Sequence, residues 1–277
     1  METTKLAKMI PLVFVSTLLC FGQSSSTPAS ALGKFAGTWK ENEAKSKLGS
    51  VPGLRFRAGA GGGLEEVRGS DAAPVIEPVH FDGKPQDIDS GKATIVWKQT
   101  GPNKFERQSS EGGQLVATRR ITISNGGKTL TEETERKRTD GKTLLLTMVY
   151  SRSSGEGPTL AGTWKADSRH TNVPAQSMVS VVGTNSLKFV NQVGLTYTAA
   201  LDNKPVPESG PGVISGTMIA LRQIDDYTIA TTLSRNGVVT STGTIKISPD
   251  GKVRTITTMN LGPNASTEPS VTVSDKQ

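Results

Sequence analysis

The chain contains one six-residue phrase twice: FAGTWK at residues 35–40 returns as LAGTWK at residues 160–165. The similarity continues beyond this phrase, since residues 94–131 align on residues 218–255 at a period of 124. Solenoid repeats are typically about 20–50 residues long, whereas a unit of this size is a complete small domain. The repeat therefore predicts two copies of one domain in tandem.

Apolar residues recur at every second position within each copy, which is the pattern of β-strands with one buried face. In residues 114–123, for example, Ile121 and Ile123 share a face with Arg119. The Asn-Gly-Gly of residues 125–127 has the chemistry of a tight hairpin. An antiparallel meander of many such strands hides its apolar face and its two edges by closing on itself. The predicted fold is all-β, with two tandem antiparallel up-and-down β-barrels.

The repeat also sets the predicted domain boundaries. We expect a first barrel over residues 32–152 and a second barrel over residues 160–277. Strand patterning stops between them, where Ser, Gly and Pro accumulate, so residues 153–159 are predicted to be a short interdomain linker.

The first 31 residues have the features of a signal peptide. Two lysines precede a short apolar core at residues 9–21, and a small-x-small cleavage motif ends at Ala31, with cleavage after Gly22 as the alternative. This core is too short to span a bilayer, and no later segment is as apolar, so no transmembrane segment is predicted. The predicted location is secreted or periplasmic. Acylation of Cys20, which would anchor the chain as a lipoprotein, is the minor alternative.

The motifs that open and punctuate the first copy carry a resemblance. GTWKENEAKSK (residues 37–47), the DGKP turn and the ITISNGGKTLT hairpin resemble secreted bacterial lipocalin-like proteins, whose domains begin GTW-x-x-N-x-x-K-S-K. The resemblance covers most of residues 35–152 and, less closely, residues 160–275, where the Lys-Ser-Lys element is missing. It implies calycin-like β-barrels of the kind that hold small apolar molecules. It also implies that Trp39 and Trp164 plug the closed ends of the two barrels.

Four further residues are candidates for ligand contact. Arg119 is predicted to point inward, where it needs a carboxylate or an anionic ligand as its partner unless it reaches solvent at the rim. Trp97 aligns with Leu221, so it either fills the core or lines a cavity. Met148 and Tyr150 lie where fatty-acid-binding proteins carry an Arg-x-Tyr pair. Because methionine replaces the arginine, that mode of carboxylate binding is not carried over.

Signals for enzymatic or nucleic-acid chemistry are weak. His80 and His170 have no neighbouring ligands at metal-binding spacing, and no G-x-S-x-G nucleophile motif occurs, so we predict no metal, no cofactor and no catalytic residue. The formal net charge is +7, but the densest charge run, residues 132–140, mixes both signs. That run is interpreted as a solvated strand face or turn, and nucleic-acid binding is not predicted.

These observations predict a non-enzymatic binding protein for small hydrophobic or amphipathic ligands, lipid-like or fatty-acid-like, held in barrel cavities. The alternative is a packed β-barrel that serves as a structural or protein-interaction module of the cell envelope. An enzyme that uses a barrel mouth is the third hypothesis.

Overall fold

The computed structural model describes residues 32–49, 53–59, 63–70, 72–262 and 268–277. The predicted signal peptide of residues 1–31, with Cys20 and the alternative cleavage after Gly22, lies outside the described residues. Within the described part of the chain, no helix is long and apolar enough to cross a membrane.

Strands dominate the described residues, and the helical elements are two single turns of 3-10 helix. In chain order, the elements are β1 (Gly37–Glu41), β2 (Leu54–Ala58), β3 (Leu64–Arg68), β4 (Val75–Val79), β5 (Gln86–Ile88), η1 (Asp89–Gly91), β6 (Ala93–Gly101), β7 (Lys104–Glu111), β8 (Gln114–Ser124), η2 (Asn125–Gly127), β9 (Thr129–Lys137), β10 (Thr143–Ser154), β11 (Gly162–Thr171), β12 (Gln176–Val182), β13 (Ser186–Asn191), β14 (Thr196–Ala200), β15 (Val206–Pro207), β16 (Thr217–Asp225), β17 (Thr228–Arg235), β18 (Val238–Ile247), β19 (Val253–Asn260) and β20 (Ser270–Lys276).

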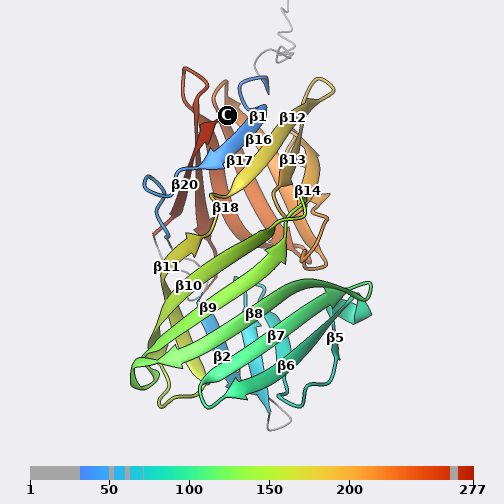
Figure 1. Cartoon of the computed structure of the whole chain (residues 1–277). Helices are drawn as coiled ribbons and strands as arrows, with labels where there is room; N and C mark the ends of the chain where they lie inside the picture. The colour runs from blue at the N-terminus through green and yellow to red at the C-terminus, as the bar shows by residue number, and fades with distance from the viewer. Residues whose placement is uncertain (1–31, 50–52, 60–62, 71, 263–267) are drawn as a thin grey trace, which may run out of the picture.

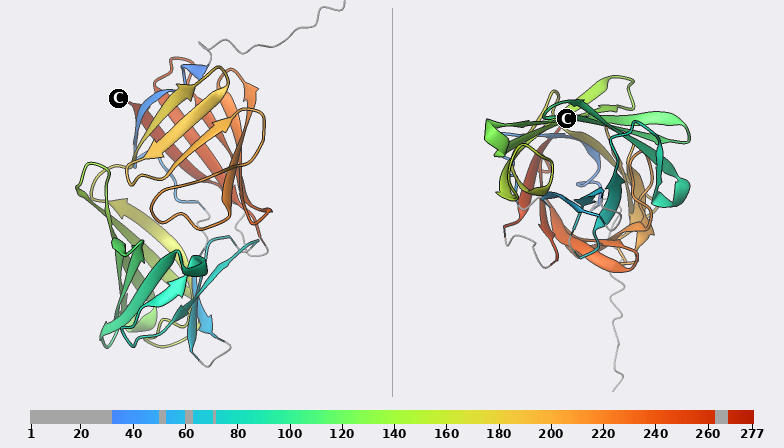
Figure 2. Two further views of the ribbon diagram at one scale, coloured as in Figure 1. Left: turned by 90° about the vertical axis from the view of Figure 1, so that its right-hand side faces the viewer. Right: turned by 90° about the horizontal axis from the view of Figure 1, so that it is seen from below.

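The strands form two antiparallel sheets of ten strands, and each sheet curls into a nearly closed barrel. The N-terminal barrel contains β2 to β11, and the C-terminal barrel contains β1 together with β12 to β20. Figure 2 shows the two barrels stacked end to end. The prediction of an all-β chain with two antiparallel barrels is therefore confirmed.

The first strand of each repeat is exchanged between the barrels. β1 lies between β12 and β20, so that Trp39 faces Ser177 on one side and Lys276 on the other. β11 in turn lies between β2 and β10, where Trp164 faces Leu54 and Arg152. In Figure 1 the blue β1 accordingly stands among the yellow and red strands of the upper barrel. Each barrel is completed by the GTW strand of the other repeat.

This exchange corrects the predicted domain boundaries. Residues 32–152 and 160–277 do not each contain one complete barrel, and residues 153–159 are not an interdomain linker. β10 and β11 are instead neighbours in one barrel, and the turn between them, residues 155–161, is a hairpin turn. A short turn brings two consecutive strands together at low entropic cost, so local pairing of β11 with β10 competes well with the distant pairing that the repeat suggested.

The hairpin turn is held by Arg152. Its guanidinium lies 3.9 Å from the centroid of the Trp164 ring. The same group donates hydrogen bonds to three carbonyl oxygens of the turn, those of Gly157, Thr159 and Ala161.

The backbone conformation explains why each GTW phrase begins with glycine. Gly37 and Gly162 both have φ of +133°, a region that residues with a side chain rarely adopt. A Cβ atom on Gly162 would also collide with the carbonyl oxygen of Ser154. The repeated phrase thus records a backbone requirement at the start of both exchanged strands.

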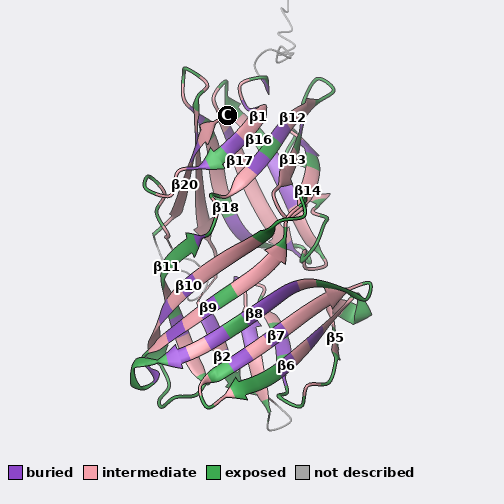
Figure 3. Cartoon of the chain, in the orientation of Figure 1, coloured by how far each residue is buried: buried purple, intermediate pink, exposed green. Residues whose placement is uncertain are grey.

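Each barrel has its own hydrophobic core, and buried and exposed residues alternate along the strands (Figure 3). Trp164 belongs to the core of the N-terminal barrel and Trp39 to that of the C-terminal barrel. Both indoles are fully buried, and each Nε1–H donates to a carbonyl oxygen four residues earlier in the chain, at 2.9 Å. Burial of a whole indole with a satisfied N–H is a large stabilising contribution to each barrel.

Candidate functional site

A cavity of about 1100 Å³ is enclosed mainly by the N-terminal barrel, at the end where residues of the C-terminal barrel also line it. Its wall comes mainly from β3 to β10. Leu144 and Leu146 line it near the start of β10, whereas Trp164 packs against Arg152 near the other end of that strand. The tryptophan therefore lies at the opposite end of the barrel from the cavity.

The C-terminal barrel covers this cavity with one loop. We call residues 208–216, which connect β15 and β16, the strap. The corresponding connection between β5 and β6 in the N-terminal barrel has four residues (89–92), whereas the strap has nine. Most strap residues line the cavity, among them the apolar Val213 and Ile214.

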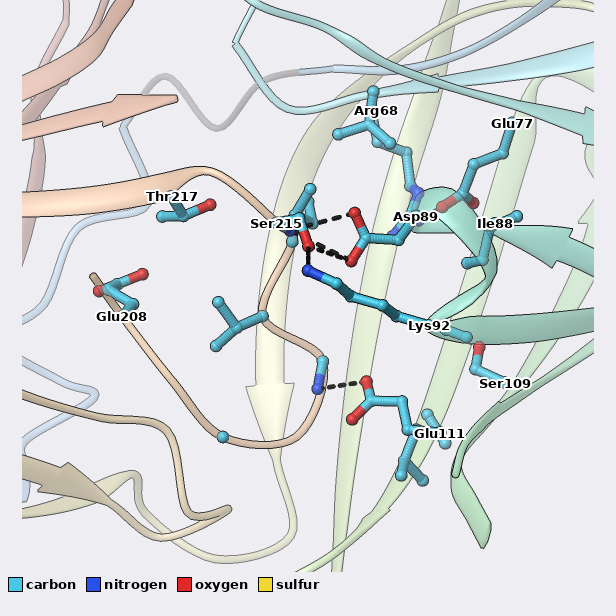
Figure 4. A pocket seen from close by; sticks show the side chains of 18 of the residues that line it. Arg68, Glu77, Ile88, Asp89, Lys92, Ser109, Glu111, Glu208, Ser215 and Thr217 are labelled. Atoms are coloured by element: carbon cyan, nitrogen blue, oxygen red, sulfur yellow. Dashed lines mark hydrogen bonds and ion pairs between the residues drawn. The ribbon is translucent and has the colours of Figure 1, made fainter. Parts of the chain in front are cut away.

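Polar contacts fix the strap to the rim of the N-terminal barrel (Figure 4). Ser215 donates to the Asp89 carboxylate from its backbone N–H, at 3.2 Å, and from its hydroxyl, at 2.7 Å. The Lys92 ammonium donates to the same hydroxyl at 2.7 Å. Farther along the strap, the backbone N–H of Gly212 donates to Glu111 at 2.7 Å. These contacts come from the middle and the C-terminal end of the strap, so the loop is attached to the barrel that it covers.

The interior wall beside the cavity carries a network of ion pairs. Arg119 Nη1 lies 2.6 Å from Glu66 Oε1 and 3.7 Å from Glu132 Oε2. Arg107 Nη2 lies 2.7 Å from Glu77 Oε2, and Arg68 Nη2 lies 2.6 Å from Glu77 Oε1. All of these side chains except that of Arg68 are buried. Pairing is required here because an isolated buried charge is strongly unfavourable.

Burial and neighbouring charges shift the pKa values of this network in different directions. For Glu66, burial alone would raise the pKa, but Arg119, Arg68 and Arg107 outweigh it and lower the pKa to about 2. Burial lowers the pKa of Arg107 to about 10, and the charges of Arg68 and Arg119 act in the same direction. The pKa of Arg119 is raised, because Glu66 and Glu132 outweigh the effect of burial. At neutral pH Glu66, Arg107 and Arg119 are therefore ionised.

The two barrels differ in how their edge strands meet. In the C-terminal barrel, Thr196 and Ser209 exchange backbone hydrogen bonds of 2.8 and 2.9 Å, which join β14 to the segment after β15. In the described part of the N-terminal barrel, no strand pairing joins β4 to β5. Residues of both unpaired edges, including Ile76 and Ile88, line the cavity, and Ile76 is 47% exposed. The cavity thus extends to an open seam between β4 and β5.

Of the four residues predicted to contact a ligand, only Arg119 lines the cavity. Arg119 is buried and lines the cavity, but its partner is a carboxylate of the protein. Trp97, Met148 and Tyr150 are buried in the hydrophobic core and do not line the cavity. Burial raises the pKa of the Tyr150 hydroxyl, and the Glu132 carboxylate acts in the same direction. Trp97 contacts a cavity-lining residue, because the Arg119 guanidinium lies 5.1 Å from the centroid of the Trp97 ring.

The interpretation of the charge run at residues 132–140 as a solvated strand face or turn is correct for one face of β9 and for the turn that follows, but wrong for the other face. Glu132, Thr134 and Arg136 line the cavity, whereas Glu133 and Lys137 are exposed. The sequence feature that separates the two faces of β9 is the alternation of residues with a period of two. This alternation does not say which face of a charged strand lies inside; here Arg119 on the neighbouring strand stabilises the inward carboxylate of Glu132.

The two histidines lie outside this site. His80 is exposed, and the exposed His170 lies with its Nδ1 3.4 Å from Glu43 Oε2. In the part of the chain that the structure describes, no cluster of three or more His, Cys, Asp or Glu side chains is arranged to hold a metal ion.

Comparison with known proteins adds little to this description. No family model and no curated protein matches the sequence. One solved structure that matches is that of a "putative outer membrane protein" from Bacteroides fragilis NCTC 9343. It is 10% identical, with 89% of this chain and 99% of that chain covered, and the TM-score is 0.18. A TM-score this low does not establish a common fold, so no property of that protein is carried over.

Proposed function

We propose that this protein is a secreted or periplasmic binding protein for small amphipathic or hydrophobic molecules, and that it works by enclosing them rather than by chemistry. The observation that carries the proposal is the cavity of about 1100 Å³ in the N-terminal barrel beneath the strap. Pockets for small molecules are usually about 300–1,000 Å³ in volume, so this cavity has room for a molecule of that size. The location rests on the signal-peptide features of residues 1–31.

The lining supports an amphipathic ligand more than a purely apolar one. Leu144 and Leu146 on the barrel wall and Val213 and Ile214 on the strap offer an apolar surface. Arginine and glutamate side chains line the wall beside them. A ligand with both an apolar body and a polar group would use both parts of this lining.

The open seam supplies a route of entry. β4 and β5 flank the cavity without pairing, and the strap is attached by side-chain contacts rather than by a ladder of backbone hydrogen bonds. Opening the seam therefore breaks no strand pairing, which is compatible with exchange of a ligand while the barrel stays folded.

Displacement of a neutral fluorescent probe tests the proposal. N-phenyl-1-naphthylamine should bind the mature protein with one site, and C12 amphiphiles should displace it. Ala117→Trp places a large side chain on the buried, cavity-lining position of β8 and should weaken probe binding by about tenfold or more. Ser124→Trp, at an exposed position at the end of the same strand, is the matched control and should bind as the wild type does.

Native mass spectrometry of freshly purified protein complements the titration, since a co-purified molecule would reveal its own class. If the folded monomer binds neither the probe nor any amphiphile, the binding function is rejected. A packed β-barrel that acts as an interaction module of the envelope would then be the better description. The hydrogen-bonded seam of the C-terminal barrel is the observation that favours that second function.

A further inference from the structure

Two arginines point into the cavity from neighbouring strands. In the β8–β9 pairing, Ala117 faces Arg136 and Arg119 faces Thr134, and all four residues line the cavity. Arg119 and Arg136 are thus diagonal neighbours on one face of the sheet, with the small Ala117 and Thr134 at the other two corners. Diagonal Cα atoms in such a pairing lie roughly 7–8 Å apart, within reach of long side chains. The two guanidinium groups can therefore both reach one small functional group of a ligand in the cavity.

Both guanidinium groups have unused hydrogen-bonding capacity. Arg119 is 6% exposed, and its Nε and Nη2 are buried without a hydrogen-bond partner, while Nη1 contacts Glu66. Arg136 makes no ion pair or side-chain hydrogen bond with the residues that the structure describes. The guanidinium of Arg136 packs against Gly212 of the strap, where a Cβ would lie 2.5 Å from Nη2. A buried donor without an acceptor is unfavourable, so the two free nitrogens of Arg119 favour an acceptor in the cavity, either water or a ligand.

Arg136 differs from the other arginines of the wall in its lack of an ion pair. Arg68, Arg107 and Arg119 each form an ion pair with a buried glutamate. Half-buried carboxylates also line the cavity, namely Asp89, Glu111 and Glu208. Asp89 accepts hydrogen bonds from Ser215, and Glu111 accepts the N–H of Gly212. Among the described residues, Arg136 is therefore the arginine of this wall without a carboxylate partner.

Apolar residues surround this pair of arginines. Leu144 faces Arg136 across the β9–β10 pairing, and Leu146 faces Thr134. Val116 on β8 and Ile214 on the strap also line the cavity. An anionic group between the arginines would consequently have apolar surface on several sides for the rest of the molecule.

We propose that the ligand of this cavity is an anionic amphiphile, whose oxyanion group is held between Arg119 and Arg136 while its apolar body lies against Leu144, Leu146 and the strap. The proposal rests on the proposed binding function and specifies its ligand class. Guanidinium groups suit this role because they bind oxyanions through paired, charge-assisted hydrogen bonds. Arg119 is positioned for it by Glu66, and Arg136 supplies a second guanidinium that forms no ion pair with the described residues.

The test compares ligands of one chain length and different head groups. Dodecanoate, dodecyl phosphate, dodecan-1-ol and dodecyltrimethylammonium are titrated against the mature protein by displacement of N-phenyl-1-naphthylamine below their micellar concentrations. At least one of the two anions should bind about tenfold or more tightly than the alcohol, and the cation should bind most weakly. The anion that binds more tightly identifies the head group as a carboxylate or a phosphate.

Arg136→Met should remove that preference, with a loss of about tenfold or more for the anion and little change for the alcohol. Lys137→Met, which removes the same charge from the adjacent exposed position, is the matched control and should leave both affinities unchanged. Arg136→Gln retains a polar side chain and should behave as Arg136→Met does. Because Arg136 has no carboxylate partner, neither variant leaves a buried glutamate unpaired, and thermal unfolding confirms that each is folded.

Two results would overturn the inference. If anion and alcohol bind the wild type equally, or if the Arg136 variants lose no more anion affinity than Lys137→Met does, the arginine pair is not an anion site, although the cavity still binds apolar molecules. If no amphiphile and no probe binds the folded protein, the binding function itself fails, and the inference fails with it.

Discussion

The N-terminal and C-terminal barrels share one strand pattern but have different interiors. The N-terminal barrel has an ion-pair network, a cavity and an open seam. In the C-terminal barrel, the buried Arg254 is bound by hydroxyl groups, with Nη2 donating to Ser177 Oγ at 2.8 Å and contacting Ser274 Oγ at 3.4 Å. Its position in the repeat corresponds to Leu130 of the N-terminal barrel, which is fully buried in the core. A duplicated frame of strands therefore accommodates two kinds of interior through changes at single inward positions.

The seam between the edge strands is hydrogen-bonded in the C-terminal barrel and open in the N-terminal barrel, and this difference also has a local cause. Offset by 120 residues, Ile76 on β4 corresponds to Thr196 on β14. Thr196 finds a backbone partner in Ser209, at the start of the long strap, whereas the shorter β5–β6 connection places no such partner beside Ile76. The same strap that seals its own barrel also covers the mouth of the other. One lengthened loop thus makes the two barrels unequal.

The largest expected effect comes from breaking the exchange of the GTW strands. Trp164→Ala should destabilise the N-terminal barrel by about 3–5 kcal/mol, although Trp164 belongs to the second repeat, because its indole fills the core of that barrel. Trp39→Ala should have the same effect on the C-terminal barrel. Hydrogen exchange measured by mass spectrometry reports each barrel separately, through peptides of β8 and β18.

Each variant serves as the control for the other. If Trp164→Ala removes protection from β18 while β8 stays protected, the strands are not exchanged in solution. Loss of protection in both barrels to the same extent would show that they unfold as one cooperative unit.

A smaller effect is expected from acid, and it should separate the two interiors. The pKa of Glu66 is lowered from 4.5 to about 2 in the folded protein, so the folded state binds fewer protons than the unfolded state in this range. The resulting stabilisation, roughly 3 kcal/mol, is present above about pH 4.5 and is lost as the pH falls toward 2. Arg254 is held by serine hydroxyls, so it has no equivalent acid-sensitive partner among these contacts. The free energy of opening, from hydrogen exchange between pH 5 and 2.5, should fall faster for β8 than for β18.

The Glu66→Gln variant identifies the group responsible. It leaves Arg119 without its closest carboxylate, so the N-terminal barrel should be less stable at neutral pH, and its extra loss of stability in acid should largely disappear. If the wild-type barrels lose stability in parallel as the pH falls, the buried ion pairs do not distinguish them.

The smallest effect is expected from loosening the strap. Ser215→Ala removes the hydroxyl that contacts both Asp89 and Lys92, which should cost about 1 kcal/mol of strap attachment and raise the dissociation rate of a bound probe several-fold. Stopped-flow displacement of N-phenyl-1-naphthylamine measures this rate. Ser153→Ala, which removes a hydroxyl hydrogen bond at the opposite end of the barrel, is the control and should leave the rate unchanged. Equal rates for the wild type and Ser215→Ala would show that the strap does not limit ligand exchange.

The sequence alone predicted the features that depend on local order along the chain. Alternation in residues 114–123 and 143–151 correctly predicted strands, because side chains in a strand point to opposite faces with a period of two. The repeat correctly predicted two barrels of one pattern, and the same alternation predicted an inward Arg119, which the structure places on the cavity wall. Glu66 and Arg136 were missed because a period of two does not say which face of a strand that carries many charges lies inside the barrel.

Only the tertiary structure decided which barrel each GTW strand completes and where the cavity lies. Both phrases present Gly-Thr-Trp-Lys and the same positive φ at glycine, so the repeated phrase itself contains no preference for one barrel over the other. The choice depends on competition between the short hairpin turn after β10 and distant pairing. The cavity depends on the strap of one repeat meeting the rim of the other, a contact between residues 126 positions apart at Ser215 and Asp89. Interactions over such separations are set by the packing of whole barrels, and no local pattern encodes them.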